Sequence, residues 1–303
     1  HYPPGHLKGY YNFVSNGKGH LHAQPSILNH HAPLRTEGAL FCHSRDPVLE
    51  VIMTANQLVP LPNAINLRSL AGYPTADGRT IKPNKLFRSG DLSHLTLAEA
   101  EQLRDQYQVK TVIDLRSDDE VKRRPDQLAD GMSYYQLPVF PFADHASFGQ
   151  RLKRRFAKPE DPIAHIYKKM LTDSHALAAY RDMFDLLLSR TEDDGAILIH
   201  CTAGKDRTGV AAMMVEGALG VTEESMQADY LASNRALETK GLLQQKRLRS
   251  ETHDLGSHPA TNETFRIVQQ LVNNSFGSWA EYFNQMIKFS SNSLITLSVN
   301  FVQ

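Results

Sequence analysis

The stretch AILIHCTAGKDRTGVAAMMVEGAL, residues 196–219, decides the fold. Its first four residues are apolar and predict a short buried strand that ends at His200. Residues 210–219 predict an almost wholly apolar helix, and Gly220 is a typical helix stop. Between them lies a short polar loop that contains two glycines. The pattern is therefore a buried strand, a tight loop and a buried helix in succession.

The sequence on either side of this stretch alternates between helical and strand patterns. TLAEAEQLRDQY opens with a capping box of Thr96 and Glu99 and predicts a helix. VKTVIDL, residues 109–115, and SYYQLPV, residues 133–139, predict strands, whereas residues 173–190 carry apolar side chains at helical spacing. This order is typical of an α/β protein. Further helices are predicted at residues 222–236, 264–272, 279–287 and, in preference to a strand, 294–301.

Composition and charge exclude several classes of protein. Lys and Arg together number 33, as do Asp and Glu, so no net positive charge would attract nucleic acid. No run of about 18 uncharged apolar residues occurs, so no membrane-spanning helix is predicted. Cys42 and Cys201 are too few for a disulfide framework, which favours a single reactive thiol. The numbering begins at His1, and both a cytoplasmic and a secreted location stay open.

Cys201 and Arg207 are separated by five residues in the loop between the strand and the helix. A tight loop at a helix N-terminus offers converging backbone N–H groups and a favourable dipole to a phosphate dianion. Gly204 and Gly209 permit the tight path of the chain. The residues expected to bind phosphate are Thr202, Ala203, Gly204, Lys205, Asp206 and Arg207.

The residue types in this loop predict covalent phosphate chemistry. The planar guanidinium of Arg207 can bind two phosphate oxygens and follow the charge that develops in the transition state. The same positive environment favours the thiolate of Cys201, which can attack phosphorus in line. Thr208 is expected to donate its hydroxyl to the departing sulfur, and His200 to support the loop by hydrogen bonding. An inert buried cysteine is the alternative, and the loop context argues against it.

At these residues the sequence resembles the protein tyrosine phosphatase superfamily, whose loop has Cys, five residues, Arg and then Ser or Thr. AGKDRTG, residues 203–209, is similar to the loop of a bacterial family of tyrosine and lipid phosphatases that has Lys and Asp inside it. Residues 66–96 and VIDLRSDDE, residues 112–120, add to this resemblance, which covers about residues 66–279.

The resemblance implies a central, mainly parallel sheet flanked by helices, with a catalytic domain over residues 61–303. It implies a cysteine-dependent phosphatase that acts on phosphotyrosine, in some members on phosphoserine or phosphothreonine, and on phosphoinositides. No metal and no cofactor are implied. Cys201 is expected as the nucleophile, Arg207 as the phosphate ligand and Lys205 as a second contact to anionic substrate.

Two other functions stay open. A phytase-like inositol polyphosphate phosphatase would use the same cysteine chemistry in a wider, basic pocket. A non-catalytic phosphate-binding module is disfavoured, because such modules usually lose one of the groups that this chain keeps as Cys201, Asp206 and Arg207.

The proton donor for the leaving group has two candidates. Asp206 lies inside the loop, as it does in the family that the sequence resembles, and is preferred because the donor must be within hydrogen-bond reach. Asp144 follows the strand predicted at 133–139, where other tyrosine phosphatases carry a mobile aspartate loop, and is the alternative acid. Asp114 and Arg116 are expected to form a supporting polar pair at a strand end.

The remaining segments are an N-terminal extension and an insertion. Residues 1–60 predict a largely irregular extension, and no recognised ligand spacing supports metal binding by its histidines. A helical lid insertion is expected at about residues 145–173. Its basic run, RLKRRFAK at residues 151–158, could attract a phosphoinositide headgroup or an acidic phosphopeptide. The expected partners are thus a phosphorylated protein or a phosphoinositide, with transient contact to an anionic membrane surface.

Overall fold

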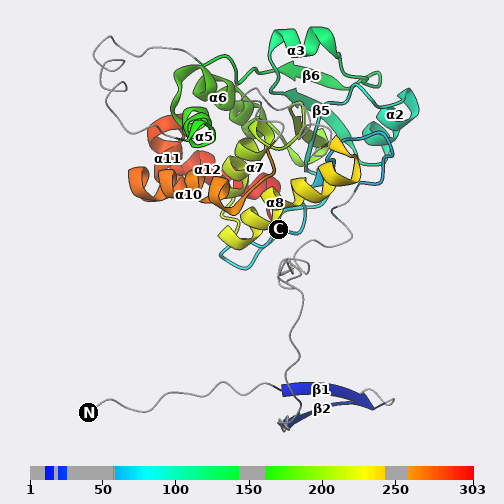
Figure 1. Cartoon of the computed structure of the whole chain (residues 1–303), viewed down its shortest axis with the longest axis vertical. Helices are drawn as coiled ribbons and strands as arrows, with labels where there is room; N and C mark the ends of the chain where they lie inside the picture. The colour runs from blue at the N-terminus through cyan, green and yellow to red at the C-terminus, as the bar shows by residue number, and fades with distance from the viewer. Residues whose placement is uncertain (1–10, 17–19, 26–56, 58, 143–160, 243–257) are drawn as a thin grey trace, which may run out of the picture. The chain divides into compact units, whose positions relative to one another are not determined.

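The computed structural model describes residues 11–16, 20–25, 57, 59–142, 161–242 and 258–303. They belong to two units, His1–Arg45 and Asp46–Gln303, which are described separately. In the first unit, β1 (Tyr11–Asn16) and β2 (His20–Pro25) form an antiparallel hairpin (Figure 1). This hairpin is a regular element within the extension that the sequence predicts to be largely irregular.

The second unit is built on a five-stranded sheet with the order β3-β4-β7-β5-β6. Only β3 runs antiparallel to its neighbour, so the mainly parallel sheet expected from the resemblance is confirmed. In the register of β7, Ile197 pairs with Leu86 and Ile199 with Ile113. The strands are β3 (Arg68–Ser69), β4 (Leu86–Ser89), β5 (Val109–Asp114), β6 (Ser133–Gln136) and β7 (Ala196–His200).

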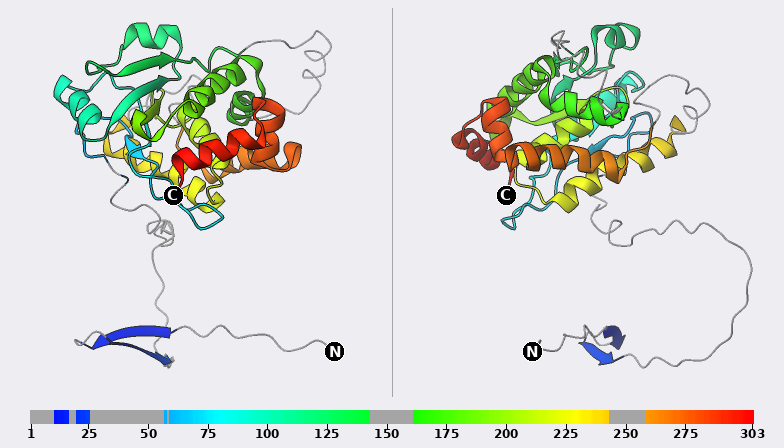
Figure 2. Two further views of the ribbon diagram at one scale, coloured as in Figure 1. Left: turned by 180° about the vertical axis from the view of Figure 1, so that it is seen from behind. Right: turned by 60° about the vertical axis from the view of Figure 1, so that its left-hand side comes forward.

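Helices cover both faces of this sheet (Figure 2). Val112 and Leu198 pack in one apolar cluster with Leu103 of α2, whereas Ile113 and Ile199 face the larger cluster formed with the remaining helices. Burial on both faces explains why the central strands are continuous apolar runs. The helices described are α2 (Leu97–Asp105), α3 (Asp118–Arg123), α5 (Pro162–Thr172), α6 (Ser174–Leu188), α7 (Arg207–Ala218), α8 (Glu223–Thr239), α10 (Asn262–Phe276), α11 (Trp279–Tyr282) and α12 (Ser291–Phe301), with the short turns η2 (Glu192–Asp194) and η4 (Phe283–Ile287).

Strand β6 is one of the two edge strands of the sheet and, unlike the other edge strand β3, it is largely exposed. Its Tyr134 and Tyr135 are 37% and 38% exposed. The predicted strand at residues 133–139 is therefore shorter than expected and only partly covered. The helix favoured for residues 294–301 is confirmed as α12.

Helix α7 is buried on nearly all sides, as its apolar sequence predicts. Its residues from Arg207 to Glu216 are all buried. Near its C-terminal end, Gly217 lies against the indole ring of Trp279, and a Cβ at this glycine would be 2.5 Å from the ring. Trp279 Nε1 also donates to Gln269 Oε1 at 3.2 Å. A glycine is thus needed where α11 packs on the backbone of α7.

Helix α5 lies in the C-terminal part of the predicted insertion. Its first turn is capped by Asp161, whose carboxylate accepts from the backbone N–H of Ile163 at 3.3 Å. Its apolar side, with Tyr167 and Met170, is buried in the main cluster. The basic run at residues 151–158 lies outside the described residues. Within the described ranges, no helix is long and apolar enough to cross a membrane.

Candidate functional site

The cysteine loop, residues 201–207, connects the end of β7 to the start of α7. Asn66 Nδ2 donates to the carbonyl oxygens of Ala203 at 3.1 Å and Gly204 at 2.9 Å, and Arg88 Nη2 donates to Gly204 O at 2.8 Å. Gly204 has φ +68, and a Cβ there would lie 2.4 Å from the backbone of Ser89. Asn66 and Arg88 hold these carbonyl oxygens on the outer side of the loop. The backbone N–H groups of the loop can therefore point inward and converge on an anion.

A buried charge network supports this face of the loop. Arg68 Nε donates to Asp229 Oδ1 at 2.8 Å, Arg88 Nη1 donates to Asp229 Oδ2, and Arg68 Nη1 donates to Asn66 Oδ1 at 2.5 Å. All four residues are buried, and Asp229 is 141 residues from Arg88 and 161 residues from Arg68. Sequence reasoning missed them as site residues, because nothing local in the sequence links Asp229 on α8 to the arginines of β3 and β4.

Glu216 of α7 is buried next to this network. Within the described structure neither of its carboxylate oxygens has a hydrogen-bond partner. Burial and the negative charge of Asp229 raise the pKa of Glu216 well above its usual range, against the opposing effect of Arg88 and Arg68. Asp229 is the opposite case, since the two arginines overcome its burial and lower its pKa. The network thus holds one ionised carboxylate and one neutral carboxylic acid.

Arg207 is held in place by Glu120 of α3. Its Nη1 and Nη2 donate to Glu120 Oε2 at 2.6 Å and Oε1 at 2.8 Å, and Nη2 also donates to Thr202 Oγ1 at 3.1 Å. The ring of Phe140 lies 5.1 Å from the guanidinium carbon. Burial would lower the pKa of Arg207, but the hydrogen bonds to Glu120 and the charge of Cys201 raise it above its ordinary value.

Glu120 was not predicted as a site residue. Burial would raise the pKa of Glu120, but the hydrogen bonds from Arg207 and the positive charge of Arg207 lower it, so Glu120 is an anion. Its sequence signals are its place at the end of VIDLRSDDE, which adds to the family resemblance, and the capping box that it forms with Ser117 in the first turn of α3. Thr202 Oγ1 donates to Glu120 Oε1 at 2.5 Å and links the carboxylate to the loop itself.

Cys201 is the first residue of the loop, and Thr208 is the second residue of α7. Both are buried. Thr208 Oγ1 has no hydrogen-bond partner in the described part of the chain, so the predicted bond to the sulfur is not formed here. Its role toward the departing thiolate stays a prediction.

Asp206 lies at the N-terminus of α7, where it is the residue before Arg207. Its Oδ1 accepts a hydrogen bond from the hydroxyl of Tyr167 at 2.6 Å and lies 3.5 Å from Lys205 Nζ. The alternative acid, Asp144, lies outside the described residues. The structure therefore places one of the two candidate acids inside the loop.

Lys205 is buried, and its ammonium group donates to the backbone carbonyl of His258. With Asp206 Oδ1 nearby, the amine is engaged with groups of the protein itself. The expected contact between Lys205 and anionic substrate stays a prediction.

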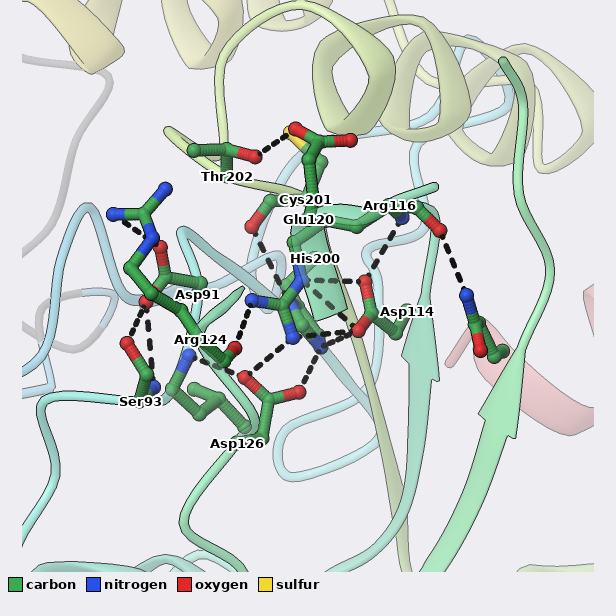
Figure 3. A network of polar contacts seen from close by, with 12 residues as sticks. Asp91, Ser93, Asp114, Arg116, Glu120, Arg124, Asp126, His200, Cys201 and Thr202 are labelled. Carbon is green, nitrogen blue, oxygen red and sulfur yellow. Dashed lines mark hydrogen bonds and ion pairs between the residues drawn. The ribbon is translucent and has the colours of Figure 1, made fainter. Parts of the chain in front are cut away.

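His200 stands behind the loop in a second buried network (Figure 3). Its Nε2 lies 3.0 Å from Asp126 Oδ2 and 3.8 Å from Asp114 Oδ2, and its Nδ1 lies 3.2 Å from the carbonyl oxygen of Cys201. Burial would lower the pKa of His200, but the hydrogen bond with Asp126 and the charge of Asp114 raise it. The imidazole contacts the backbone of the loop, and Asp126 was not predicted as its partner.

Asp114, Asp126 and His200 have potential metal-ligand atoms within 4.8 Å of one another. Arg116 Nη2, however, lies 2.7 Å from Asp114 Oδ2 and 2.9 Å from Asp126 Oδ1. The guanidinium takes the place between the carboxylates that a cation would need. The predicted pairing of Asp114 with Arg116 is confirmed, and the group is an ion-pair network.

Comparison with known proteins finds relatives that are named as protein phosphatases. Triple specificity protein phosphatase PtpB of Mycobacterium tuberculosis is 33% identical over 193 residues, which cover 57% of this chain and 68% of that protein. A tyrosine-protein phosphatase of Nostoc commune is 30% identical over 170 residues, 55% of this chain and 54% of that protein. The core catalytic domain of the PP-IP phosphatase SIW14 from S. cerevisiae has a TM-score of 0.33 at 13% identity, over 69% of this chain and 87% of that structure.

The chain spans 54% to 68% of the lengths of the curated relatives that it matches. A family model described as the tyrosine phosphatase family matches residues 59–303, the region that holds the sheet, the cysteine loop and both supporting networks. Because this match covers more than half of the chain, the chain belongs to the tyrosine phosphatase family.

Proposed function

We propose that the chain is a cysteine-dependent phosphoric monoester hydrolase whose reaction takes place in the cysteine loop. The observation that carries the proposal is the pairing of Cys201 with Arg207, whose guanidinium is already oriented by the two hydrogen bonds that it donates to Glu120 and the one that it donates to Thr202. A positioned guanidinium can stabilise the equatorial oxygens of a transferring phosphoryl group without further reorganisation.

In the first step, the thiolate of Cys201 attacks phosphorus and the phosphorus–oxygen bond to the leaving group breaks. The leaving oxygen takes a proton from the carboxyl group of Asp206, and the phosphoryl group is carried on sulfur. Asp206 is the preferred donor because it lies in the loop itself, next to Arg207.

In the second step, water attacks the same phosphorus and the sulfur–phosphorus bond breaks. Asp206, now a carboxylate, takes the proton from water, and inorganic phosphate leaves. The buried hydroxyl of Thr208, which has no partner among the described residues, is available to donate to the thiolate as it re-forms. Each cycle thus returns the thiolate of Cys201 and the protonated Asp206.

The substrates that we propose are phosphotyrosine, with phosphoserine or phosphothreonine, and phosphoinositides. Membership of the tyrosine phosphatase family supports the first. The triple specificity in the name of the Mycobacterium tuberculosis relative supports a range wider than one phosphoamino acid. The basic run at residues 151–158 supports an anionic partner, either an acidic phosphopeptide or a membrane surface that carries phosphoinositides.

The test is phosphate release from four substrates by the wild type and by the variants Cys201→Ser, Asp206→Ala and Asp144→Ala. The substrates are a phosphotyrosine peptide, a phosphoserine peptide, soluble phosphoinositides and phytate. Cys42→Ser is the matched control, because it removes the other thiol of the chain. Intact-mass analysis after rapid acid quench detects the phosphorylated cysteine directly.

We expect Cys201→Ser to be inactive, Cys42→Ser to keep full activity and Asp206→Ala to lose most activity on peptide and lipid. Turnover by Cys201→Ser would exclude the thiol mechanism. If only Asp144→Ala loses activity, the acid belongs to the segment after β6 rather than to the loop. Phytate as the preferred substrate would favour the phytase-like alternative, and binding without turnover would favour a phosphate-binding module.

A further inference from the structure

Two buried tyrosines stand behind the candidate acid Asp206. Tyr167 comes from α5, in the predicted insertion, and Tyr230 from α8. The hydroxyl of Tyr167 lies 2.6 Å from Asp206 Oδ1 and 2.8 Å from the hydroxyl of Tyr230. Both side chains are almost fully buried, at 1% exposure. Two successive contacts therefore link three elements that are distant in sequence, α8, α5 and the start of α7.

The direction of the hydrogen bonds follows from the chemistry of these groups. Tyr167 has one hydroxyl proton, and the structure commits it to the Asp206 oxygen. The bond between the two hydroxyls must then be donated by Tyr230. Burial and the charge of Asp206 raise the pKa of both tyrosines, so both phenols remain protonated donors. The result is a chain from Tyr230 to Tyr167 to Asp206.

The rings that carry these hydroxyls are fixed by packing. The Tyr167 and Tyr230 rings meet edge to face at 6.4 Å, and Tyr230 packs on Phe265 at the same centroid distance. Tyr230 also lies against Gly209, where an added Cβ would be 3.1 Å from its ring. The chain of hydroxyls is therefore built onto the start of α7 and does not depend on a mobile side chain.

Among the described residues, Tyr167 and Lys205 both contact the Asp206 carboxylate at Oδ1. Since Tyr167 donates to this oxygen, it restrains the rotation of the carboxyl group, and Oδ2 is the oxygen that can present a proton to a leaving group. A general acid must present its proton within hydrogen-bond reach of the leaving oxygen. The contact with Tyr167 limits the directions in which Asp206 can do so.

We propose that Tyr167, supported by Tyr230, is a positioning residue that orients Asp206 Oδ2 toward the leaving group. This inference rests on the proposed function, in which Asp206 is the acid. It also means that helix α5 of the insertion contributes to proton transfer without touching the substrate.

The test uses two substrates that differ in their need for an acid. The phenolate released from 4-nitrophenyl phosphate is stabilised by its nitro group, whereas phenyl phosphate needs protonation as the bond breaks. We expect Asp206→Asn to lose roughly 100-fold or more in kcat on phenyl phosphate and much less on 4-nitrophenyl phosphate. Tyr167→Phe should show the same selective loss at about 10-fold, because it keeps the acid but removes its orienting bond.

Tyr282→Phe is the matched control. Tyr282 is equally buried, and its hydroxyl donates one hydrogen bond, to the carbonyl of Leu171 at 3.0 Å. This variant should lose similar thermal stability but keep the wild-type ratio of the two rates. In the Asp206→Asn background, Tyr167→Phe should change that ratio by less than about twofold, because no acid remains to be oriented. Tyr230→Phe, which removes only the supporting donor, should have a weaker effect in the same direction.

The outcomes separate the two proposals. If Asp206→Asn is selective for phenyl phosphate but neither tyrosine variant is, the positioning role is wrong while the acid assignment stands. If Tyr167→Phe lowers both rates equally, its role is structural and the inference fails. If Asp206→Asn is itself not selective, both the acid assignment and the inference are overturned. Should Tyr167→Phe not fold, Tyr230→Phe alone decides, since its selectivity can be read in the same assay.

Discussion

Replacing Glu216 with glutamine should make the protein more stable, and more so as the pH rises. Glu216 is buried in α7, and neither of its oxygens has a hydrogen-bond partner among the described residues. Burial and Asp229 raise its pKa well above the usual range. The folded protein must therefore keep this carboxyl group protonated at a pH where the unfolded chain releases the proton.

The size of the effect follows from proton linkage. When folding raises the pKa of a group, its contribution to stability is complete below the pKa of the unfolded chain. The contribution is then lost progressively as the pH rises from this value to the pKa of the folded protein. Between the two values the wild type loses about 1.4 kcal/mol of unfolding free energy per pH unit through this residue. Each pH unit in this interval therefore removes a sizeable share of the roughly 5–15 kcal/mol that is typical of a folded domain.

The assay is urea unfolding of the wild type and Glu216→Gln, followed by circular dichroism at several pH values. The difference in unfolding free energy should grow by about 1.4 kcal/mol per pH unit in favour of glutamine. Glu216→Met should give the same slope, because it also removes the titrating group. A difference that does not change with pH, or one that grows in favour of the wild type, would show that Glu216 is ionised in the folded protein.

Three further predictions concern the two networks and the loop. Asp229→Asn should lower the unfolding free energy by about 3–5 kcal/mol in urea titrations, because Arg68 and Arg88 lose their common carboxylate. Gly204→Ala should abolish phosphatase activity even if the protein folds, since a Cβ would lie 2.4 Å from the Ser89 backbone and the φ of +68 is unfavourable for alanine. Asp126→Asn should destabilise the protein more at acidic than at alkaline pH in melting experiments. The raised pKa of His200 makes its pairing stabilising below its unfolded pKa, and this stabilisation is lost as the imidazolium deprotonates.

The sequence predicted the parts of the site that depend on neighbouring residues. The strand that ends at His200, the loop and helix α7 follow one another along the chain, so apolar runs, glycines and charge order were enough to locate them. The pairing of Asp114 with Arg116 was predictable for the same reason, because the two residues are only two positions apart.

The partners of the loop could not be predicted, because folding brings them together from distant segments. Glu120 is 87 residues from Arg207, and Asn66 is 138 residues from Gly204. A glutamate in an acidic helix start or an asparagine before a strand carries no sign of such a contact. Tyr167 likewise has the helical spacing of an ordinary core residue, and only the structure shows its hydroxyl on Asp206.

The contact between Trp279 and Gly217 gives the protein a built-in optical probe. Trp279 is the single tryptophan of the chain, so its fluorescence needs no correction for other indoles. Its ring lies on the backbone of α7, about 15 Å along the helix from Arg207 at 1.5 Å per residue. A shift of the helix on phosphate binding would alter the surroundings of the ring and hence its emission. The occupancy of the loop can therefore be followed at the far end of the helix without any label.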